Sequence, residues 1–313
     1  MYHPYFRGKQ YELITVRDMA ELMAAAGFVP IIEPVKESLG GLQRALGAVC
    51  TAKGRAVVIV NPYHGEHSED GEGIEELLSE GFPDANISAG ILLTKDTVLA
   101  EAGESYALHK GKRPITLIHA GFADPKGVVD ALGDDLTTVK HVFFEPYCGK
   151  LYRKHFAGSK RVLLRDGFQR RRNKDHPEME LFSDLHITYG EEGMDGFGDF
   201  LIVGDEFTES GGPAYAVAIH LTFIDRTQDS AMYIYHFKSK RVDTPTDPAG
   251  KFGEALDAMI KKLDSGTSGM LETSAVREFR ALHEAKHFPG LGYVKKLSMN
   301  HHIETLAAFF GKA

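Results

Sequence analysis

The sequence predicts an α/β protein, a closed (β/α)8 TIM-like barrel with an inserted β-hairpin after the eighth strand and extra C-terminal helices. Eight short apolar runs, most of them separated by segments with helical spacing, indicate a parallel sheet. A count of eight favours a closed barrel, and an open doubly wound sheet stays the alternative. No GxGxxG pattern follows the first run, which weakens a dinucleotide-binding interpretation and leaves no nucleotide-cofactor motif there.

Three of the apolar runs end in a polar residue followed by proline. They are VPIIEP, VVIVNP and VFFEP, in which Glu33, Asn61 and Glu145 precede the proline. Proline fixes its own φ and biases the preceding residue towards extended geometry. Each of the three polar residues should therefore be the last extended residue of a strand.

The first half of the chain alternates between the two periodicities. Apolar runs predict strands over residues 2–8, 29–35, 56–60 and 87–93. Helical spacing of the apolar residues predicts helices between and after them, over residues 10–26, 39–51, 74–80 and 97–109. Four strand-helix units precede residue 110.

The second half continues the alternation and then changes character. Strands are expected over residues 114–119, 141–145, 161–165 and 200–203, with helices over 126–132, 151–157 and 181–186. A long polar loop follows the seventh strand, and a glycine-rich stretch over residues 190–198 precedes the eighth.

A β-hairpin is expected after the barrel strands. Residues 214–224 and 232–237 alternate apolar with polar or aromatic residues, and the turn-rich DRTQDS joins them. We place this insertion at about residues 208–240, followed by C-terminal helices at about 251–311. No linker is long enough to separate a second domain, so we expect one domain over residues 1–313.

Composition and charge narrow the class of protein. The chain is 43% hydrophobic and 26% charged, as in ordinary globular proteins, and its net charge of -8 argues against a general nucleic-acid-binding surface. Cys50 and Cys148 match no metal-ligand spacing, and we expect reduced thiols. No signal peptide or membrane-length apolar run is apparent, so we expect a cytoplasmic protein without membrane contact.

The candidate site residues are the polar residues that end the apolar runs, because barrels of this kind build their active sites at the carboxyl ends of the strands. Carboxylates there could act as bases or hold a hard divalent metal such as Mg²⁺, and cations could hold an anionic or phosphate-bearing substrate. The predicted catalytic residues are Glu33, Glu145, Asp166 and His119. The predicted substrate-binding residues are Arg7, Lys9, Asn61 and Arg165, and the predicted metal ligands are Asp205 and Glu33.

Each candidate also has a structural alternative. Asn-Pro and Asp-Gly are common turn formers, which applies to Asn61 and Asp166, and His119 could be a structural histidine. The basic run Arg170–Arg172 with Lys174 and His176 is either a solvated loop or a contact for phosphate or nucleic acid. His220 and His236 alternate within the hairpin, and we expect them to be packing residues.

Several stretches resemble a known group of proteins. They are PYFRGKQYELITVRDMAELM, VPIIEPVKE, AVVIVNP, GFGDFLIVGDEF, GGPAYAVAIHLTF and MYIYHF, which together are similar to an uncharacterised bacterial family. The opening strand and helix are also distantly similar to the phage beta-protein family, with Lys9, Gln10, Glu33 and Asp205 matching the pattern most clearly. The resemblance implies a barrel-like fold and phage-defence or mobile-element neighbourhoods with a companion protein encoded nearby. It also adds Gln10 to the substrate-binding candidates.

Two functions remain open from the sequence. The first is a hydrolase acting on a phosphate-containing substrate, a nucleotide or nucleic-acid end, as a metal-dependent phosphoric-ester hydrolase. The second is a non-catalytic binding module or subunit that recognises a partner protein through the barrel mouth. The two differ in whether the polar strand ends line an open cavity or form salt bridges with one another.

Overall fold

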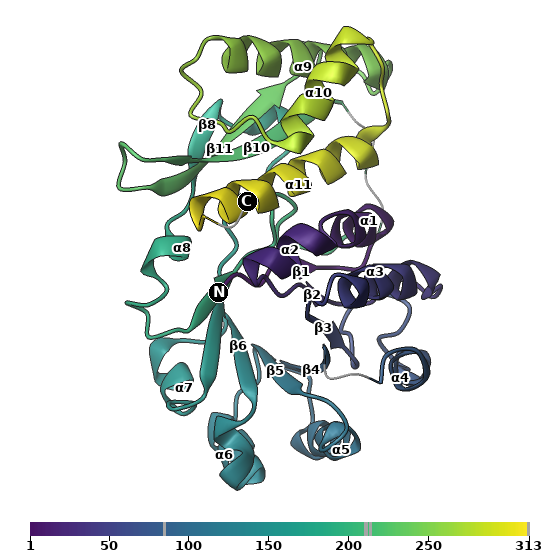
Figure 1. Ribbon diagram of the computed structural model, residues 1–313, viewed down its shortest axis with the longest axis vertical. Helices are drawn as coiled ribbons and strands as arrows, with labels where there is room; N and C mark the ends of the chain where they lie inside the picture. The colour runs from purple at the N-terminus through teal and green to yellow at the C-terminus, as the bar shows by residue number, and fades with distance from the viewer. Residues whose placement is uncertain (84–85, 210–211, 213–214, 312–313) are drawn as a thin grey trace. The chain divides into compact units, whose positions relative to one another are not determined.

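The computed structural model describes residues 1–83, 86–209, 212 and 215–311 (Figure 1). The chain divides into two compact units. Unit 1 is Met1–Arg165 with Thr188–Phe200, and unit 2 is Asp166–Ile187 with Leu201–Ala313. The single domain expected over residues 1–313 stays a prediction.

Unit 1 contains the barrel. Among the described residues, eight parallel strands form one sheet in chain order: β1 (Tyr5–Phe6), β2 (Ile31–Ile32), β3 (Ala56–Ile59), β4 (Ile87–Thr94), β5 (Ile115–Ala120), β6 (Lys140–Phe144), β7 (Lys160–Leu164) and β9 (Gly196–Gly198). The first and last strands also meet. A parallel bridge joins Tyr2 to Phe197, and the Tyr5 amide donates to the Asp199 carbonyl over 2.9 Å. The predicted (β/α)8 barrel is confirmed.

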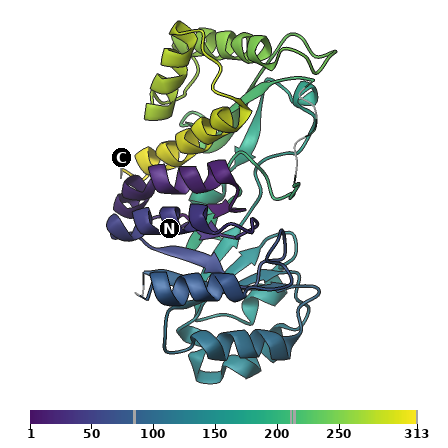
Figure 2. The same cartoon turned by 90° about the vertical axis from the view of Figure 1, so that its right-hand side faces the viewer.

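Helices surround these strands (Figures 1 and 2). They are α1 (Gln10–Asp18), α2 (Ala20–Ala26), α3 (Gly40–Thr51), α4 (Glu72–Gly81), α5 (Leu99–His109), α6 (Pro125–Leu132) and α7 (Lys150–Lys154), with a 3-10 turn η1 (Gly133–Thr137). Local chemistry sets their ends. Asp124 caps α6 by accepting from the Gly127 amide, with proline at the first helical position. The single helix expected over residues 10–26 is two helices, which meet at Met19.

Side-chain alternation fills the barrel. Successive strand residues point to opposite faces, so every second one faces inward. The buried inner cluster includes Val57 and Ile59 of β3 and Val142 and Phe144 of β6. Where the strands end, the rings of Tyr5, Phe144 and Phe200 lie with centroids 5.0 to 5.4 Å apart. These three rings close the interior beneath the carboxyl-terminal mouth.

The eighth barrel strand is not where the sequence predicts it. Residues 201–203 form a turn, with Leu201 at φ 51°, and the strand is Gly196–Gly198. The reason is that a side chain would not fit at the glycines of this strand. A Cβ on Gly198 would lie 2.1 Å from the His3 carbonyl oxygen, and one on Gly196 would lie 2.6 Å from that of Met1. The barrel closes through glycines, which an apolar-run criterion cannot recognise as a strand.

Unit 2 is an antiparallel sheet with helices. Among the described residues, the strands of this sheet lie in the order β10 (Ala218–Asp225), β11 (Ala231–Lys238) and β8 (Met179–Ser183). The unit also contains the helices α9 (Pro248–Asp264), α10 (Ser274–Glu284) and α11 (Leu291–Phe309). The hairpin and the C-terminal helices are therefore as predicted. Of the insertion expected at about residues 208–240, residues 210–211 and 213–214 lie outside the described residues. The helix predicted over residues 181–186 is wrong: β8 ends at Ser183, α8 covers Leu185–Thr188, and the short turn η2 covers Asn173–Asp175.

One face of the hairpin builds the core of unit 2. Ile219 and Leu221 of β10 and Phe237 of β11 are buried in one cluster with residues of the three C-terminal helices. Period-two alternation then directs His220 and His236 to the opposite face. The two histidines are direct cross-strand partners.

Candidate functional site

Glu33 is the centre of a buried polar network at the barrel mouth. It follows β2 directly, and its side chain is fully buried. Oε2 accepts from the Tyr5 hydroxyl at 2.8 Å and from Arg7 Nη1 at 2.6 Å. Oε1 accepts from the backbone amides of Tyr63 and His64 at 3.0 Å each, and His64 Nδ1 lies at the same distance. Five donors thus converge on one carboxylate.

Glu33 stays ionised although it is buried. Burial by itself raises the pKa of a carboxyl group, but the hydrogen bond from His64 and the charge of Arg7 outweigh it. The pKa of Glu33 falls from 4.5 to about 2. Glu33 is therefore an ionised acceptor that holds its neighbours in place.

Among those neighbours, His64 is a residue that the sequence analysis passed over. It lies in the polar loop after β3, and its side chain is 27% exposed. Nδ1 of His64 lies 3.0 Å from Oε1 of Glu33, which can only accept, and 2.9 Å from Nη1 of Arg7, which can only donate. With its proton on Nδ1, the imidazole donates to the carboxylate and carries the basic lone pair on Nε2. A carboxylate that orients a histidine in this way is a common arrangement for proton transfer. The available signal was its position two residues after Pro62, at the carboxyl end of a strand.

Glycines let the surrounding loops approach Glu33. Gly8 has φ 60°, and a Cβ there would lie 2.7 Å from the Glu33 carbonyl oxygen. Gly65 has φ 83°, and a Cβ there would lie 2.2 Å from the Val35 carbonyl oxygen. Only glycine fits both the backbone angles and the space. The loops after β1 and β3 are thereby packed against the segment after β2.

Arg7 is buried beside this carboxylate. Its Nη1 lies 2.9 Å from His64 Nδ1, and its guanidinium carbon lies 5.3 Å from the centroid of the Tyr5 ring and 5.8 Å from that of Phe200. The aromatic rings and the carboxylate together stabilise the buried cation. The predicted candidates Arg7 and Glu33 are therefore in direct contact.

Glu145 and Arg165 form a second pair at the strand ends. Arg165 donates from Nε to Glu145 Oε2 at 2.6 Å and from Nη2 to Oε1 at 2.8 Å. The side chains are 31% and 27% exposed. This bidentate pair joins the ends of β6 and β7 and presents charge to solvent.

Asn61 and His119 make structural contacts. The Asn61 amide donates to the Leu92 carbonyl at 2.9 Å and accepts from the Leu92 amide at 2.8 Å, which extends the pairing of β3 with β4. His119 lies on the helix-facing side of β5, because Ile118 faces inward. It is fully buried, with Nδ1 2.9 Å from the Tyr152 hydroxyl and Nε2 3.0 Å from His141 Nδ1. Burial lowers the pKa of His119 well below its usual value.

The remaining candidates lie as follows. Lys9 is the N-cap of α1 and Gln10 is the exposed first residue of that helix. Asp166 belongs to unit 2, where its oxygens accept from the amides of Phe168 and Asp205 at 2.9 and 2.8 Å. Asp205 is also in unit 2, whereas Glu33 is in unit 1. The metal pair of Asp205 and Glu33 stays a prediction.

The basic run of the sequence is neutralised within unit 2. Arg170 pairs with Glu206, Arg171 with Glu180 and Arg172 with Asp175. Three consecutive arginines thus each contact a carboxylate.

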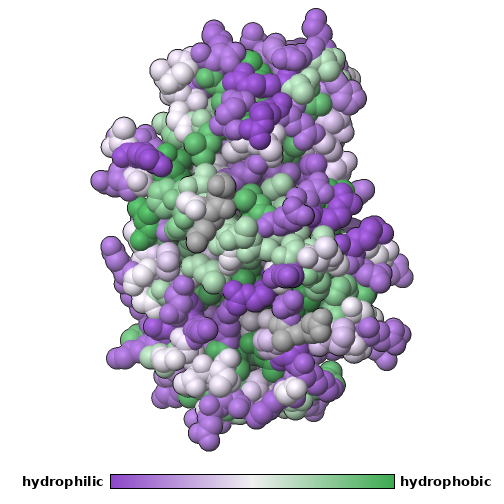
Figure 3. All heavy atoms as spheres, in the orientation of Figure 1, coloured by the Kyte–Doolittle hydropathy of each residue, from purple (hydrophilic) through white to green (hydrophobic). Residues whose placement is uncertain are grey.

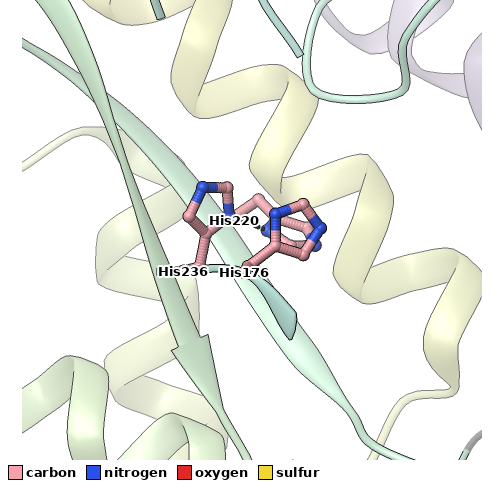
Figure 4. A group of neighbouring side chains, drawn as sticks. All are labelled: His176, His220 and His236. Atoms are coloured by element: carbon pink, nitrogen blue, oxygen red, sulfur yellow. Dashed lines mark hydrogen bonds between the residues drawn. The ribbon is translucent and has the colours of Figure 1, made fainter. Parts of the chain in front are cut away.

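A histidine cluster in unit 2 is the feature that sequence reasoning missed. His176, His220 and His236 each offer a ring nitrogen within 4.8 Å of the other two (Figure 4). Burial lowers the pKa of all three, that of His236 to about 4. Burial alone would raise the pKa of the neighbouring Glu180, but the hydrogen bond from Arg171 and its charge lower it. The signal available in the sequence was period-two spacing on two strands of a hairpin.

Within the described residues, no helix is long and apolar enough to cross a membrane. Comparison of the chain with protein-family models, with curated proteins and with solved structures finds no match in any of the three.

Proposed function

We propose that the barrel is a hydrolase acting on a phosphate-containing substrate, a nucleotide or a nucleic-acid end, at the carboxyl ends of its strands. The observation that carries the proposal is the buried Glu33 carboxylate, which holds His64 through Oε1 and Arg7 through Oε2. A proton acceptor and a cation are thereby fixed side by side. A general base beside a cation is one arrangement that supports attack of water on a phosphate ester.

The reaction follows from those roles. Nε2 of His64 accepts a proton from water while the water oxygen bonds to phosphorus and the bond from phosphorus to the leaving oxygen breaks. The departing oxygen then takes a proton from the imidazolium or from solvent. Arg7 and Arg165 stabilise the charge on the phosphoryl oxygens, and Lys9 and Gln10 bind more distant parts of the substrate. Glu33 is a positioning residue in this scheme.

A divalent metal such as Mg²⁺ remains part of the proposal. Because five donors already surround Glu33, no step is assigned to a metal on that carboxylate. Glu145 remains a candidate for proton transfer at the strand ends of unit 1, and Asp166 remains a separate candidate in unit 2. Titration of metal-free protein with Mg²⁺ during the activity assay measures whether hydrolysis depends on the ion.

The decisive experiment compares two histidines of one loop. Wild-type protein, His64→Gln and His67→Gln are assayed with p-nitrophenyl phosphate, its bis ester, nucleotides and 5′- and 3′-phosphorylated oligonucleotides. We expect His64→Gln to lower kcat about 10²- to 10⁴-fold, as loss of a general base does, and His67→Gln to retain activity. His67 is the matched control because its ring lies 3.1 Å from the Lys36 carbonyl oxygen instead. Equal activity of the two variants, or no hydrolysis of any substrate by the wild type, contradicts the proposal.

A binding module is the second candidate, and the ion pairs at the mouth favour it. Arg7 with Glu33 and Arg165 with Glu145 are strand-end residues joined to one another. A surface that only recognises a partner protein needs such fixed charges and no turnover. The proposal includes a cytoplasmic companion protein encoded nearby. Co-purification of that companion, lost in Arg165→Met while all substrates stay intact, would support binding over hydrolysis.

A further inference from the structure

Three segments of unit 2 bring three imidazoles together. His220 comes from β10, His236 from β11, and His176 from the loop before β8 (Figure 4). The His176 ring stacks on that of His236, with centroids 4.2 Å apart and planes 22° apart. His220 and His236 point their Nδ1 atoms at each other over 2.7 Å. The cluster is set by backbone pairing, because these two residues are cross-strand partners.

His176 is buried without a hydrogen bond. It is 2% exposed, and within the described residues neither ring nitrogen has a hydrogen-bonding partner. The nearest carboxylate, Glu180 Oε1, lies 3.8 Å from Nδ1, beyond hydrogen-bonding distance. Buried polar atoms are almost always paired with protein, water or an ion. This imidazole therefore points to a ligand inside the cluster.

Glu180 provides the outer contact that metal-binding histidines usually have. Its Oε1 lies 3.0 Å from Nε2 of His236, so that nitrogen donates and Nδ1 carries the lone pair. Arg171 contacts the same carboxylate oxygen at 2.5 Å. The carboxylate fixes the tautomer of His236 with its lone pair facing His220.

An apolar ring covers the group. The centroid of Phe168 lies 5.4 Å from that of His176 and 5.1 Å from that of His220. His236 is itself 2% exposed. Water has restricted access to the nitrogens, which strengthens coordination by them.

A tetrahedral ion requires moderate shifts of the three nitrogens. Zinc–nitrogen bonds of about 2.0–2.1 Å place ligand nitrogens about 3.4 Å apart. The three nitrogens lie within 4.8 Å, so shifts on the order of 1 Å bring them to that spacing.

We propose that His176, His220 and His236 bind one Zn²⁺ ion, each through one ring nitrogen, with Glu180 orienting His236 from the outer shell. Three protein nitrogens leave the fourth position of a tetrahedral ion to water or an anion. Imidazoles without thiolates select ions of the zinc class over Mg²⁺. This site does not depend on hydrolysis at the barrel mouth.

The test uses full-length protein without a histidine tag, stripped with a chelator and titrated with Zn²⁺ in a calorimeter. Bound metal is counted by mass spectrometry. We expect one zinc per chain in the wild type, and visible absorption bands of tetrahedral cobalt when Co²⁺ replaces it. The double variant His176→Phe/His236→Gln should lose this binding. His283→Gln is the matched control, since this half-exposed histidine of unit 2 contacts Asp257 away from the cluster.

A second variant tests the site even if the double variant misfolds. Glu180→Gln keeps all three ligands, and we expect its zinc affinity to fall about 10- to 100-fold. Zinc should also raise the Tm of the wild type and of His283→Gln, but not that of the double variant. Absence of zinc uptake by the wild type, or equal uptake by the double variant, overturns the proposal. The Irving–Williams order sets the affinities for Cu²⁺ and Ni²⁺ that are expected relative to Zn²⁺. Binding of either ion more tightly than that order predicts overturns the choice of zinc.

Discussion

Glu33 and Arg7 are buried as a charged pair in unit 1, with the side chains 0% and 7% exposed. A buried pair is costly to break, because removing one partner leaves the other charge in a poorly solvated position. Tyr5 and two backbone amides add neutral donors to the same carboxylate. The network holds the loops after β1, β2 and β3 in one arrangement.

Glu33→Gln is expected to destabilise unit 1 by about 3 kcal/mol at pH 7. The pKa of Glu33 is about 2 in the fold against 4.5 for the ordinary group, so its contribution is present above pH 4.5 and is lost as pH falls towards 2. The difference in unfolding free energy between wild type and variant should therefore shrink across this range. Urea unfolding followed by circular dichroism, repeated at each pH, measures it.

The control for this prediction is Glu101→Gln, which removes an exposed carboxylate from α5. It should leave stability nearly unchanged at every pH. A Glu33→Gln protein as stable as wild type at pH 7, or a difference that grows on acidification, would show that the Glu33 charge does not stabilise the fold.

Strand β9 is the element that closes the barrel. Its glycines allow the N-terminal segment to pass within van der Waals distance, as the amide of His3 donates to the Phe197 carbonyl at 2.8 Å. Leu164 of β7 approaches Gly198 from inside, where a Cβ would lie 2.4 Å from its Cδ2. The seam, meaning the contact of β9 with the N-terminal segment and with β7, therefore has no space for a side chain at Gly198.

Gly198→Ala should lower the stability of the barrel by about 1–3 kcal/mol or more, because a methyl group meets backbone on one side and Leu164 on the other. Gly103→Ala is the matched control. Gly103 lies inside helix α5, and a Cβ there has nothing within 4 Å. It should stabilise by about 0.5–1 kcal/mol, since alanine favours a helix over glycine. Thermal and urea unfolding of both variants give the signs, and a neutral Gly198→Ala would refute the tight seam.

The chain as a whole carries an excess of negative charge. The formal net charge is -8, and hydrophilic residues are spread over the face shown in Figure 3. The densest basic run, Arg170 to Arg172, is paired residue by residue with carboxylates. A protein that binds phosphate backbones non-specifically needs clustered cations instead.

The protein is therefore expected not to bind duplex DNA non-specifically at physiological salt, with any Kd weaker than about 10⁻⁴ M. Fluorescence anisotropy with a labelled duplex at several salt concentrations measures this. The double variant Glu206→Gln/Asp175→Asn releases two of the arginines and should bind more tightly, with a steeper salt dependence. Micromolar binding by the wild type would show that another cationic surface is present.

Local rules predicted much of the barrel. Glu33 and Glu145 directly follow β2 and β6, as the proline after each one indicates. The helices of unit 1 lie near their expected positions, because apolar spacing reports which face is buried. The prediction failed at β9, where close approach of backbone requires glycine and leaves no apolar signal.

The candidate site was predicted less completely. Arg7 and Arg165 lie at the mouth as expected, but their carboxylate partners depend on which loops come together. The local signal for His64 was only its position after Pro62, and its importance comes from the contact of its Nδ1 with Glu33 Oε1 at 3.0 Å. His119 was placed at a strand end correctly, yet the face it occupies depends on the register of β5.

Hydrophobic periodicity and proline act over a few neighbouring residues, so they specify the class of fold and the order of its parts. Which polar groups meet depends on the folded chain. Glu33 and His64 are 31 positions apart, and His176 and His236 are farther apart still. Contacts over such separations depend on strand register and on loop packing, which no local pattern encodes.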